Sequence, residues 1–106
     1  MNKQVVSKLV NKVALVTGGS RGIGAAIAKR LAADGATVAI TYAKDASAAS
    51  AVVNAIELDG GKAIAIRADA ADVEAVKGAV EKTVATFGRL DVLVNNAGTA
   101  LSLRHI

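Results

Sequence analysis

The chain has 106 residues, a net charge of +4, 53% hydrophobic residues, 2% aromatic residues and no cysteine. This size suits one modest hydrophobic core, and the lack of cysteine excludes a disulfide framework and thiolate chemistry. The basic residues are scattered and have no interleaved aromatic side chains, which argues against a nucleic-acid partner. No apolar run has the length of a signal-peptide core or a membrane span, so we expect a cytoplasmic protein without a membrane partner.

Strands and helices are predicted to alternate along the whole chain. Short apolar runs predict strands at residues 13–17, 37–41, 63–67 and 92–95. Helical spacing of apolar residues predicts helices at residues 22–33, 46–58 and 72–87. Right-handed crossovers between such strands give an α/β fold, a Rossmann-type doubly wound parallel sheet. We expect it to be truncated to about four strands, in the order 3-2-1-4, and three helices.

Each predicted helix carries an apolar stripe. The stripe residues are Ile23, Ile27 and Leu31 in the first helix, Ala49, Val52, Val53 and Ile56 in the second, and Val73, Val76, Val80, Val84 and Phe87 in the third. Stripes of this kind cover the face of a sheet. We therefore expect these side chains to form the core.

The first strand passes to the first helix through a glycine-rich stretch, Thr17-Gly18-Gly19-Ser20-Arg21-Gly22-Ile23-Gly24. Glycines permit a tight turn with positive φ, let the backbone approach a ligand, and at Gly24 let the helix lie tight against the first strand. The unpaired N–H groups at a helix start and the positive end of its dipole favour an anion such as a pyrophosphate. A Walker loop is excluded, because Ala25 and Ala26 stand where Lys and then Ser or Thr would follow. The stretch therefore predicts nucleotide binding rather than a plain turn.

Two motifs stand in order along the chain, Thr-Gly-x3-Gly-Ile-Gly at residues 17–24 and Asn95-Asn96-Ala97-Gly98 after the last predicted strand. On both motifs the chain resembles the classical short-chain dehydrogenases/reductases, most closely the 3-oxoacyl-carrier-protein reductase-like branch. The resemblance implies that residues 1–106 are a single NAD(P)-binding Rossmann domain, the N-terminal half of an enzyme that reduces a carbonyl by hydride transfer. Residues 99–106 depart from the family's pattern, and we expect them to be an atypical or truncated end.

The predicted cofactor site gathers the glycine stretch and the turns that follow the other strands. Its residues are Gly18, Gly19, Ser20, Arg21, Gly22, Ile23, Gly24, Tyr42, Lys44, Asp69, Ala70, Asn95, Asn96, Ala97 and Gly98. The resemblance places Asp69 and Ala70 at the adenine, and the stretch from Asn95 to Gly98 beside the adenine-side ribose. On its residue type alone, Asp69 with Asp72 also fits an acidic start or cap of the third helix.

The end of the second predicted strand favours NADP(H) over NADH. An NAD enzyme usually has an Asp or Glu about twenty residues beyond the glycines, where it binds the ribose hydroxyls. Here Thr41, Tyr42 and Ala43 occupy that position. Lys44 and Arg21 add two cations that suit a 2′-phosphate, although ordinary solvated charge is the alternative, above all for Lys44.

No catalytic residue and no metal ligand are predicted in this sequence. The family's proton transfer depends on a Ser and a Tyr-x3-Lys, in which the Lys lowers the pKa of the Tyr. The single tyrosine, Tyr42, is followed four residues later by Ala46 and lies on the ribose side of the predicted site.

Three interpretations remain open. The chain could be an oxidoreductase fragment, a catalytically inert dinucleotide-binding module, or an unrelated Rossmann-like domain such as a methyltransferase. The last is disfavoured by the missing acid after the second strand and by the motif that begins at Asn95. We also expect self-association through the edge of the strand at residues 92–95, because that edge is open, flat and uncharged.

Overall fold

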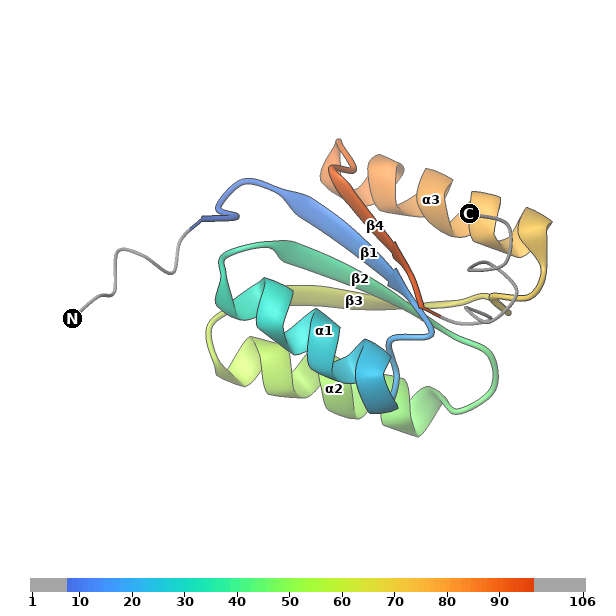
Figure 1. The fold of residues 1–106 in the computed structure, drawn as a ribbon, viewed down its shortest axis with the longest axis horizontal. Helices are drawn as coiled ribbons and strands as arrows, with labels where there is room; N and C mark the ends of the chain where they lie inside the picture. The colour runs from blue at the N-terminus through green and yellow to red at the C-terminus, as the bar shows by residue number, and fades with distance from the viewer. Residues whose placement is uncertain (1–7, 97–106) are drawn as a thin grey trace.

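The computed structural model describes residues 8–96 as a parallel sheet with helices on both faces (Figure 1). The strands are β1 (Val13–Thr17), β2 (Thr37–Tyr42), β3 (Lys62–Arg67) and β4 (Val92–Asn95). The helices are α1 (Gly22–Ala33), α2 (Ala46–Leu58) and α3 (Val73–Phe87). Within residues 8–96, no helix has the length and apolar character needed to cross a membrane. The atypical end expected at residues 99–106 lies outside the described residues.

The strand order β3-β2-β1-β4 confirms the predicted topology. The bounds differ slightly from the prediction: β2 extends to Tyr42, β3 begins at Lys62, and α3 begins at Val73 because Asp72 is its N-cap. Because all the strands are parallel, their carboxyl ends lie at one edge of the sheet. Thr17 pairs with Asn95 at this edge, so the two sequence motifs begin side by side.

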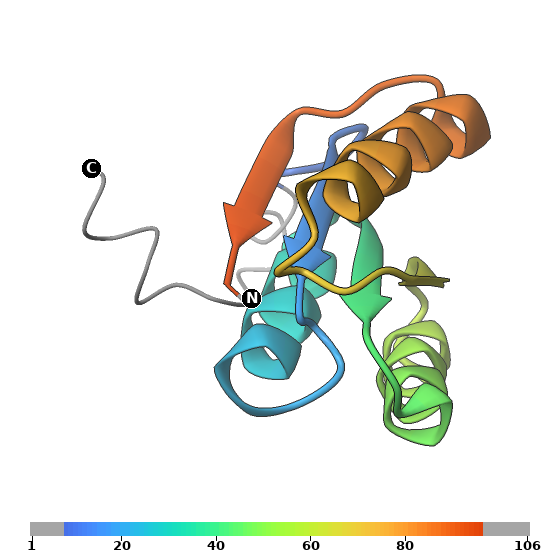
Figure 2. The same ribbon diagram turned by 90° about the vertical axis from the view of Figure 1, so that its right-hand side faces the viewer.

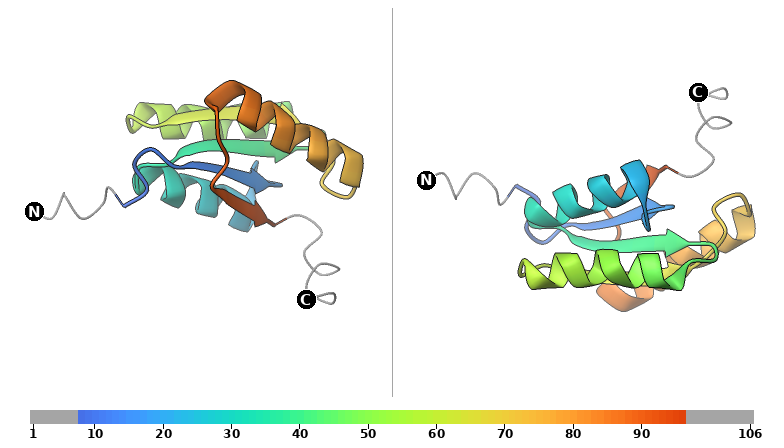
Figure 3. Two further views of the ribbon diagram at one scale, coloured as in Figure 1. Left: turned by 90° about the horizontal axis from the view of Figure 1, so that it is seen from above. Right: turned by 90° about the horizontal axis from the view of Figure 1, so that it is seen from below.

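The sheet separates two layers of helices, with α1 and α2 on one face and α3 on the other (Figures 2 and 3). Side chains alternate along the strands, so Val16 and Ile40 pack with α1 and α2 while Leu15 and Ala39 pack toward α3. Every residue of β1 is buried, as expected for a central strand covered on both faces.

The apolar stripe predicted for α3 is confirmed only in part: Val80 packs against the buried cluster on this face of the sheet, and Val76 and Phe87 are half-buried. Val73 and Val84 are 67% and 40% exposed, whereas Ala79 and Thr83 are buried. Small side chains let a helix lie close to a sheet, so the buried line of α3 runs through Ala79 and Thr83. The exposed valines lie along the flank of the helix.

The other two stripes agree better with the structure. In α2, Ala49, Val52 and Ile56 are buried, which confirms that prediction. In α1, Ile27 and Leu31 are half-buried, but Ile23 is 73% exposed. Its exposure follows from its place in the first turn of α1, at the glycine-rich loop, and it corrects the expectation of a core residue.

Asp91 fastens the start of β4 to the start of β1. The Asp91 N–H donates to the carbonyl of Val13 at 2.8 Å, and the Asp91 carboxylate accepts the Val13 N–H at 2.8 Å. Arg89 donates two further hydrogen bonds to the same carboxylate, at 2.8 and 2.9 Å. The Arg89 guanidinium, followed by the Val13 N–H, therefore holds the pKa of Asp91 below its ordinary value.

This pKa predicts how stability depends on pH. A carboxylate whose pKa is lower in the folded chain stabilises it fully above the unfolded-state pKa of about 4, and the contribution is lost as the pH falls through the folded-state pKa. We expect Asp91→Asn to lower the free energy of unfolding at neutral pH, and the deficit to shrink below about pH 4. Urea unfolding of the wild type and of Asp91→Asn, from neutral pH to below about pH 4, measures this difference in the free energy of unfolding.

The matched control is Asp59→Asn, because the Asp59 side chain accepts no hydrogen bond from the described residues. We expect this control to show a much smaller deficit at neutral pH. A deficit for Asp91→Asn that stayed constant down to about pH 2 would contradict the assignment.

Candidate functional site

The loop between β1 and α1 has the backbone that glycine alone adopts easily. Gly18 and Gly22 have φ values of 67° and 61°, in the left-handed region. A Cβ added at Gly22 would meet nothing within 4 Å, so the space in front of the loop is open. A Cβ added at Gly24 would collide with the Gly18 carbonyl oxygen and lie 2.7 Å from Nδ2 of Asn96. The close contact expected between Gly24 and the first strand is therefore made with the loop and with the chain after β4.

Thr41 holds this loop to the end of β2. Its buried hydroxyl accepts the Gly18 N–H at 2.9 Å, and its carbonyl accepts the Gly19 N–H at 3.1 Å. The sequence identified Thr41 only as the residue that replaces an acid. A threonine at the end of an otherwise apolar strand is the signal that points to such a tether, but the partner becomes evident only when β2 lies beside β1.

Thr17 holds the start of the loop to the end of β4 in the same way. Its buried hydroxyl accepts the Asn96 N–H at 3.0 Å and lies 3.2 Å from Oδ1 of Asn95. Nδ2 of Asn96 donates to the Gly18 carbonyl at 3.3 Å. The two sequence motifs therefore belong to one hydrogen-bond network.

The start of α1 differs from the other helix starts in the described part of the chain. Asp45 caps α2 by accepting the Ala48 N–H at 2.9 Å, and Asp72 caps α3 by accepting the Glu74 N–H at 3.0 Å. At α1 the N-cap residue is Arg21, which makes no capping hydrogen bond, and the first turn contains no acidic residue. The first-turn N–H groups and the positive end of the dipole are thus available to an anion.

A hollow of about 220 Å³ lies beside this helix start, between the loop and the end of β2. It is lined by Gly18, Ser20, Arg21, Tyr42, Ala43, Lys44 and Asp45. The cationic side chains of Arg21 and Lys44 are exposed here. Asp45, the acid in the same hollow, directs Oδ1 to the start of α2 as its cap. The hollow therefore presents two cations and one carboxylate that is already hydrogen-bonded.

A second hollow of about 170 Å³ adjoins the first and shares Gly18, Tyr42 and Ala43 with it. Asp69 and Ala70 line it as well. Oδ1 of Asp69 accepts the Ala71 N–H at 2.9 Å, and Oδ2 accepts no hydrogen bond from residues 8–96. The helix-cap alternative therefore applies to Asp72, and Asp69 keeps one oxygen for a ligand.

The predicted contact residues that the structure describes gather at the carboxyl edge of the sheet. The stretch from Gly18 to Gly24 and the residues Tyr42, Lys44, Asp69 and Ala70 surround the two hollows or the start of α1, and Asn95 and Asn96 join them through Thr17. Ala97 and Gly98, the other two predicted contacts, lie outside the described residues.

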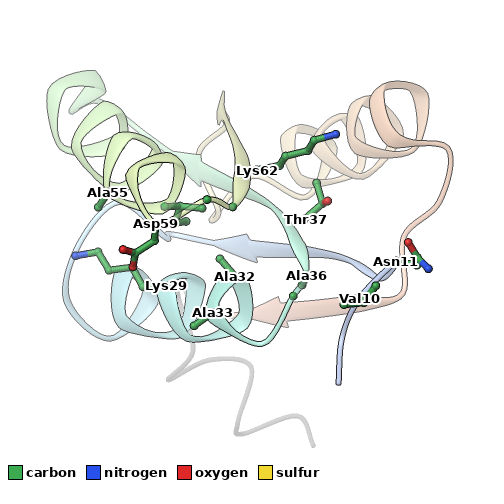
Figure 4. A pocket seen from close by; sticks show the side chains of 14 residues that line it. Val10, Asn11, Lys29, Ala32, Ala33, Ala36, Thr37, Ala55, Asp59 and Lys62 are labelled. Carbon is green, nitrogen blue, oxygen red and sulfur yellow. The ribbon is translucent and has the colours of Figure 1, made fainter. Parts of the chain in front are cut away.

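A hollow of about 390 Å³ lies at the opposite edge of the sheet, between the C-terminal ends of α1 and α2 (Figure 4). Lys29, Asp59 and Lys62 line it. Helix C-termini present carbonyl oxygens and the negative end of the dipole, which disfavour a phosphate. Although this hollow is larger than the two at the loop, its surroundings suit an anion less well, and the candidate site is the glycine-rich loop.

Comparison with known proteins identifies the family of the chain. The profile of the family described as short chain dehydrogenase matches residues 12–105. An uncharacterized oxidoreductase of Methylorubrum extorquens is 59% identical over 93 residues, which are 88% of this chain and 38% of the relative. The 3-oxoacyl-[acyl-carrier-protein] reductase of Synechocystis sp. is 50% identical over 93 residues, with the same coverage of 88% and 38%.

Among solved structures, a short chain dehydrogenase from Burkholderia cenocepacia in complex with NADP is similar at a TM-score of 0.82 and 67% identity, over 86% of this chain and 37% of that one. The chain thus spans between 37% and 38% of the length of these relatives. The matched range contains both sequence motifs, which removes the interpretation as an unrelated Rossmann-like domain. The chain belongs to the short-chain dehydrogenase/reductase family of oxidoreductases.

Proposed function

We propose that this chain binds NADP(H) as the dinucleotide-binding part of an NADP(H)-dependent oxidoreductase. The observation that carries the proposal is the uncapped start of α1, which follows the positive-φ glycines and opens beside two cations. The N–H groups of Gly22, Ile23 and Gly24 would bind the diphosphate there. The open space in front of Gly22 gives the phosphates room to approach the backbone.

The hollow beside the loop supports NADP(H) over NADH. Arg21 and Lys44 would bind the 2′-phosphate, since a guanidinium and an ammonium both form charge-assisted hydrogen bonds with phosphate oxygens. The negative charge of Asp45 would repel a phosphate, but this repulsion is reduced because its carboxylate accepts a hydrogen bond at the start of α2. The NADP complex of the Burkholderia cenocepacia relative supports the same choice.

The adenine would occupy the second hollow. Oδ2 of Asp69 is positioned to accept the exocyclic amine, and the neighbouring Ala70 adds backbone that can approach the ring. Asn95, Asn96, Ala97 and Gly98 would lie beside the adenine-side ribose, at the end of the strand that Thr17 ties to the loop.

Binding and orientation are the tasks that we assign to these residues. When bound, NADPH supplies a hydride for the reduction of a carbonyl group, which is the activity that we propose for the whole protein. The protonating Tyr of the family and its Lys are not matched here, because Tyr42 has Ala46 four residues later and lines the cofactor hollows. For residues 1–106 taken alone, this observation favours a second candidate function, dinucleotide binding without turnover as a catalytically inert module.

We also infer that the chain self-associates at the side of the sheet where β4 is the edge strand. In the described part of the chain, β4 pairs with β1 and leaves its other edge open. Unpaired strand edges offer hydrogen-bonding groups and apolar side chains to a partner.

The NADP(H) proposal predicts unequal effects of cation removal on the two cofactors. Arg21→Ala and Lys44→Ala should each weaken NADPH binding about tenfold or more, because a hydrogen bond to a charged group contributes about 1.5–3 kcal/mol. NADH affinity should change little, since it lacks the 2′-phosphate. Thermal-shift titration measures both, and saturating NADPH at about 100 times its Kd should stabilise the wild-type chain by about 2.7 kcal/mol.

Lys62→Ala removes an equal charge at the opposite edge of the sheet and serves as the control. We expect it to bind both cofactors as the wild type does. Equal losses for NADPH and NADH in the Arg21→Ala chain would contradict the assignment of the 2′-phosphate.

A pair of glycine substitutions tests the close contact at the loop. Alanine at a helical glycine gains about 1 kcal/mol of helix propensity, and Gly78→Ala in α3 should show that gain, since a Cβ there meets nothing within 4 Å. Gly24→Ala should instead lower stability by about 1–3 kcal/mol, because its Cβ collides with the Gly18 carbonyl. It should also weaken NADPH binding. Denaturant unfolding with and without NADPH measures both effects, and equal stabilisation by the two substitutions would contradict the contact.

An assay of NADPH oxidation with a panel of small ketones separates the two candidate functions for these 106 residues. We expect no turnover, since general acid–base catalysis contributes about 10²–10⁴-fold and its tyrosine and lysine are not matched in this sequence. Saturable, ketone-dependent oxidation by the purified chain would contradict this expectation and exclude the inert module.

A further inference from the structure

Two helices end in an Asp-Gly turn at the edge of the sheet opposite the cofactor hollows. The helix α1 is followed by Asp34-Gly35 and α2 by Asp59-Gly60. The aspartates have φ and ψ of −84° and 5° in the first turn and −88° and 8° in the second, and the glycines have φ of 105° and 90°. In both turns the glycine N–H donates at 3.0 Å to the carbonyl three residues earlier. The chain therefore contains the same turn twice, in two different surroundings.

The turn at Asp34 is held closed from outside its helix. The Asp34 carbonyl accepts the Leu9 N–H at 2.8 Å, and its carboxylate accepts a hydrogen bond from Nε of Arg30 at 3.3 Å. The Asp34 side chain is 25% exposed. A Cβ added at Gly35 would lie 2.9 Å from a methyl carbon of Val10, so the segment before β1 covers this turn.

The turn at Asp59 has no such cover. Asp59 is exposed, and neither its carboxylate nor its carbonyl accepts a hydrogen bond from residues 8–96. A Cβ added at Gly60 would meet nothing within 4 Å. The Asp59 side chain lines the hollow at this edge of the sheet (Figure 4). The turn leads into β3, the edge strand farthest from β4, so it lies apart from both the cofactor site and the end of the described chain.

An aspartate followed by glycine can rearrange, because glycine has no side chain to hinder attack by its own main-chain nitrogen. That nitrogen attacks Cγ of the protonated carboxyl group, and a C–N bond forms while the carboxyl OH leaves with the amide proton as water. The product is a five-membered succinimide. Water then adds to the main-chain carbonyl of the ring and breaks its bond to nitrogen, which leaves isoaspartate, with the chain continuing through Cγ. Water is the only co-reactant.

Opening of the turn controls this reaction in a folded chain. The peptide unit after the aspartate must rotate out of its helical ψ before the glycine nitrogen can reach Cγ, so the helix-end hydrogen bonds have to break first. At Asp59 these are the bonds from Gly60 to Glu57 and from Gly61 to Ile56. At Asp34 the contacts with Leu9 and Arg30 must break as well.

We propose that Asp59-Gly60 is a site of isoaspartate formation in the folded chain, and that the fold protects Asp34-Gly35. The isoaspartate adds one carbon to the main chain before Gly60. The hydrogen bonds from Gly60 and Gly61 back to α2 cannot both keep their geometry across this longer chain. The modification therefore loosens the end of α2, where Ile56 belongs to the core.

Ageing of the folded 106-residue chain at mildly acidic pH, followed by trypsin, tests the proposal. Trypsin places the two turns in separate peptides, residues 31–44 and 45–62. Isoaspartate gives a chromatographic isomer of unchanged mass that an aspartate-specific endoprotease does not cut before residue 59. We expect this isomer to form about tenfold or more faster in peptide 45–62 than its counterpart in 31–44, because the additional hydrogen bonds at Asp34 make its opening rarer.

The same ageing in denaturing urea separates the effect of the fold from that of the sequence. In urea the two peptides should isomerise at similar rates, because both turns are Asp-Gly and neither is held closed. The same large excess in urea would show that local sequence sets the difference, and would overturn the protection of Asp34. Equal rates in the folded chain, or no isomer at residue 59, would overturn the proposal.

Asp59→Glu identifies the reacting residue while keeping the charge, because glutamate would have to close a larger, six-membered ring. We expect this chain to give no isomer in peptide 45–62 and an unchanged rate in 31–44. Asp34→Glu is the matched control and should leave the rate in 45–62 as in the wild type. An isomer that persists in 45–62 of the Asp59→Glu chain would place the reaction at another residue and contradict the assignment. Circular dichroism before ageing verifies that the variants fold.

Discussion

The available N–H groups at the start of α1 are the feature on which the account of this chain depends. A helix start leaves several N–H groups without partners, and the side chains of Asp45 and Asp72 accept one of them in α2 and two in α3. At α1 Arg21 makes no capping hydrogen bond, and we propose that the diphosphate of the cofactor takes the place of a cap. The loop must then hold its shape without help from a cap.

Two threonines at strand ends, Thr41 and Thr17, hold the loop in its conformation by hydrogen bonds. Thr41 ties the loop to β2 and Thr17 ties it to the chain after β4, so the loop and the ends of three strands form one hydrogen-bond network. Parallel pairing is what brings these ends to the same edge. The hollows that we propose for the 2′-phosphate and the adenine lie between the same strand ends, which explains why residues far apart in sequence meet there.

The sequence predicted the strands, helices and topology well because buried parallel strands are continuous apolar runs and each is followed by a clear helix pattern. It predicted the buried face of α3 only in part, because Val80 packs against the core but Val73 and Val84 are exposed. Valines are more apolar than Ala79 and Thr83, but burial here depends on how closely the helix can approach the sheet, and small side chains allow the closest contact. The sequence also did not predict the hydrogen bond between Gly18 and Thr41. These residues meet only because β2 pairs with β1, and no local sequence pattern reports that pairing.

Amide chemical shifts followed by NMR during NADPH titration test the central claim most directly. The account predicts that the N–H signals of Gly22, Ile23 and Gly24 move on binding, while those of Gly35 and Gly60, at the opposite edge of the sheet, stay in place. Adenosine without phosphates should leave the signals at the start of α1 unmoved. Saturable NADPH binding that shifts other amides but not those of Gly22 to Gly24 would contradict the claim that this helix start holds the diphosphate.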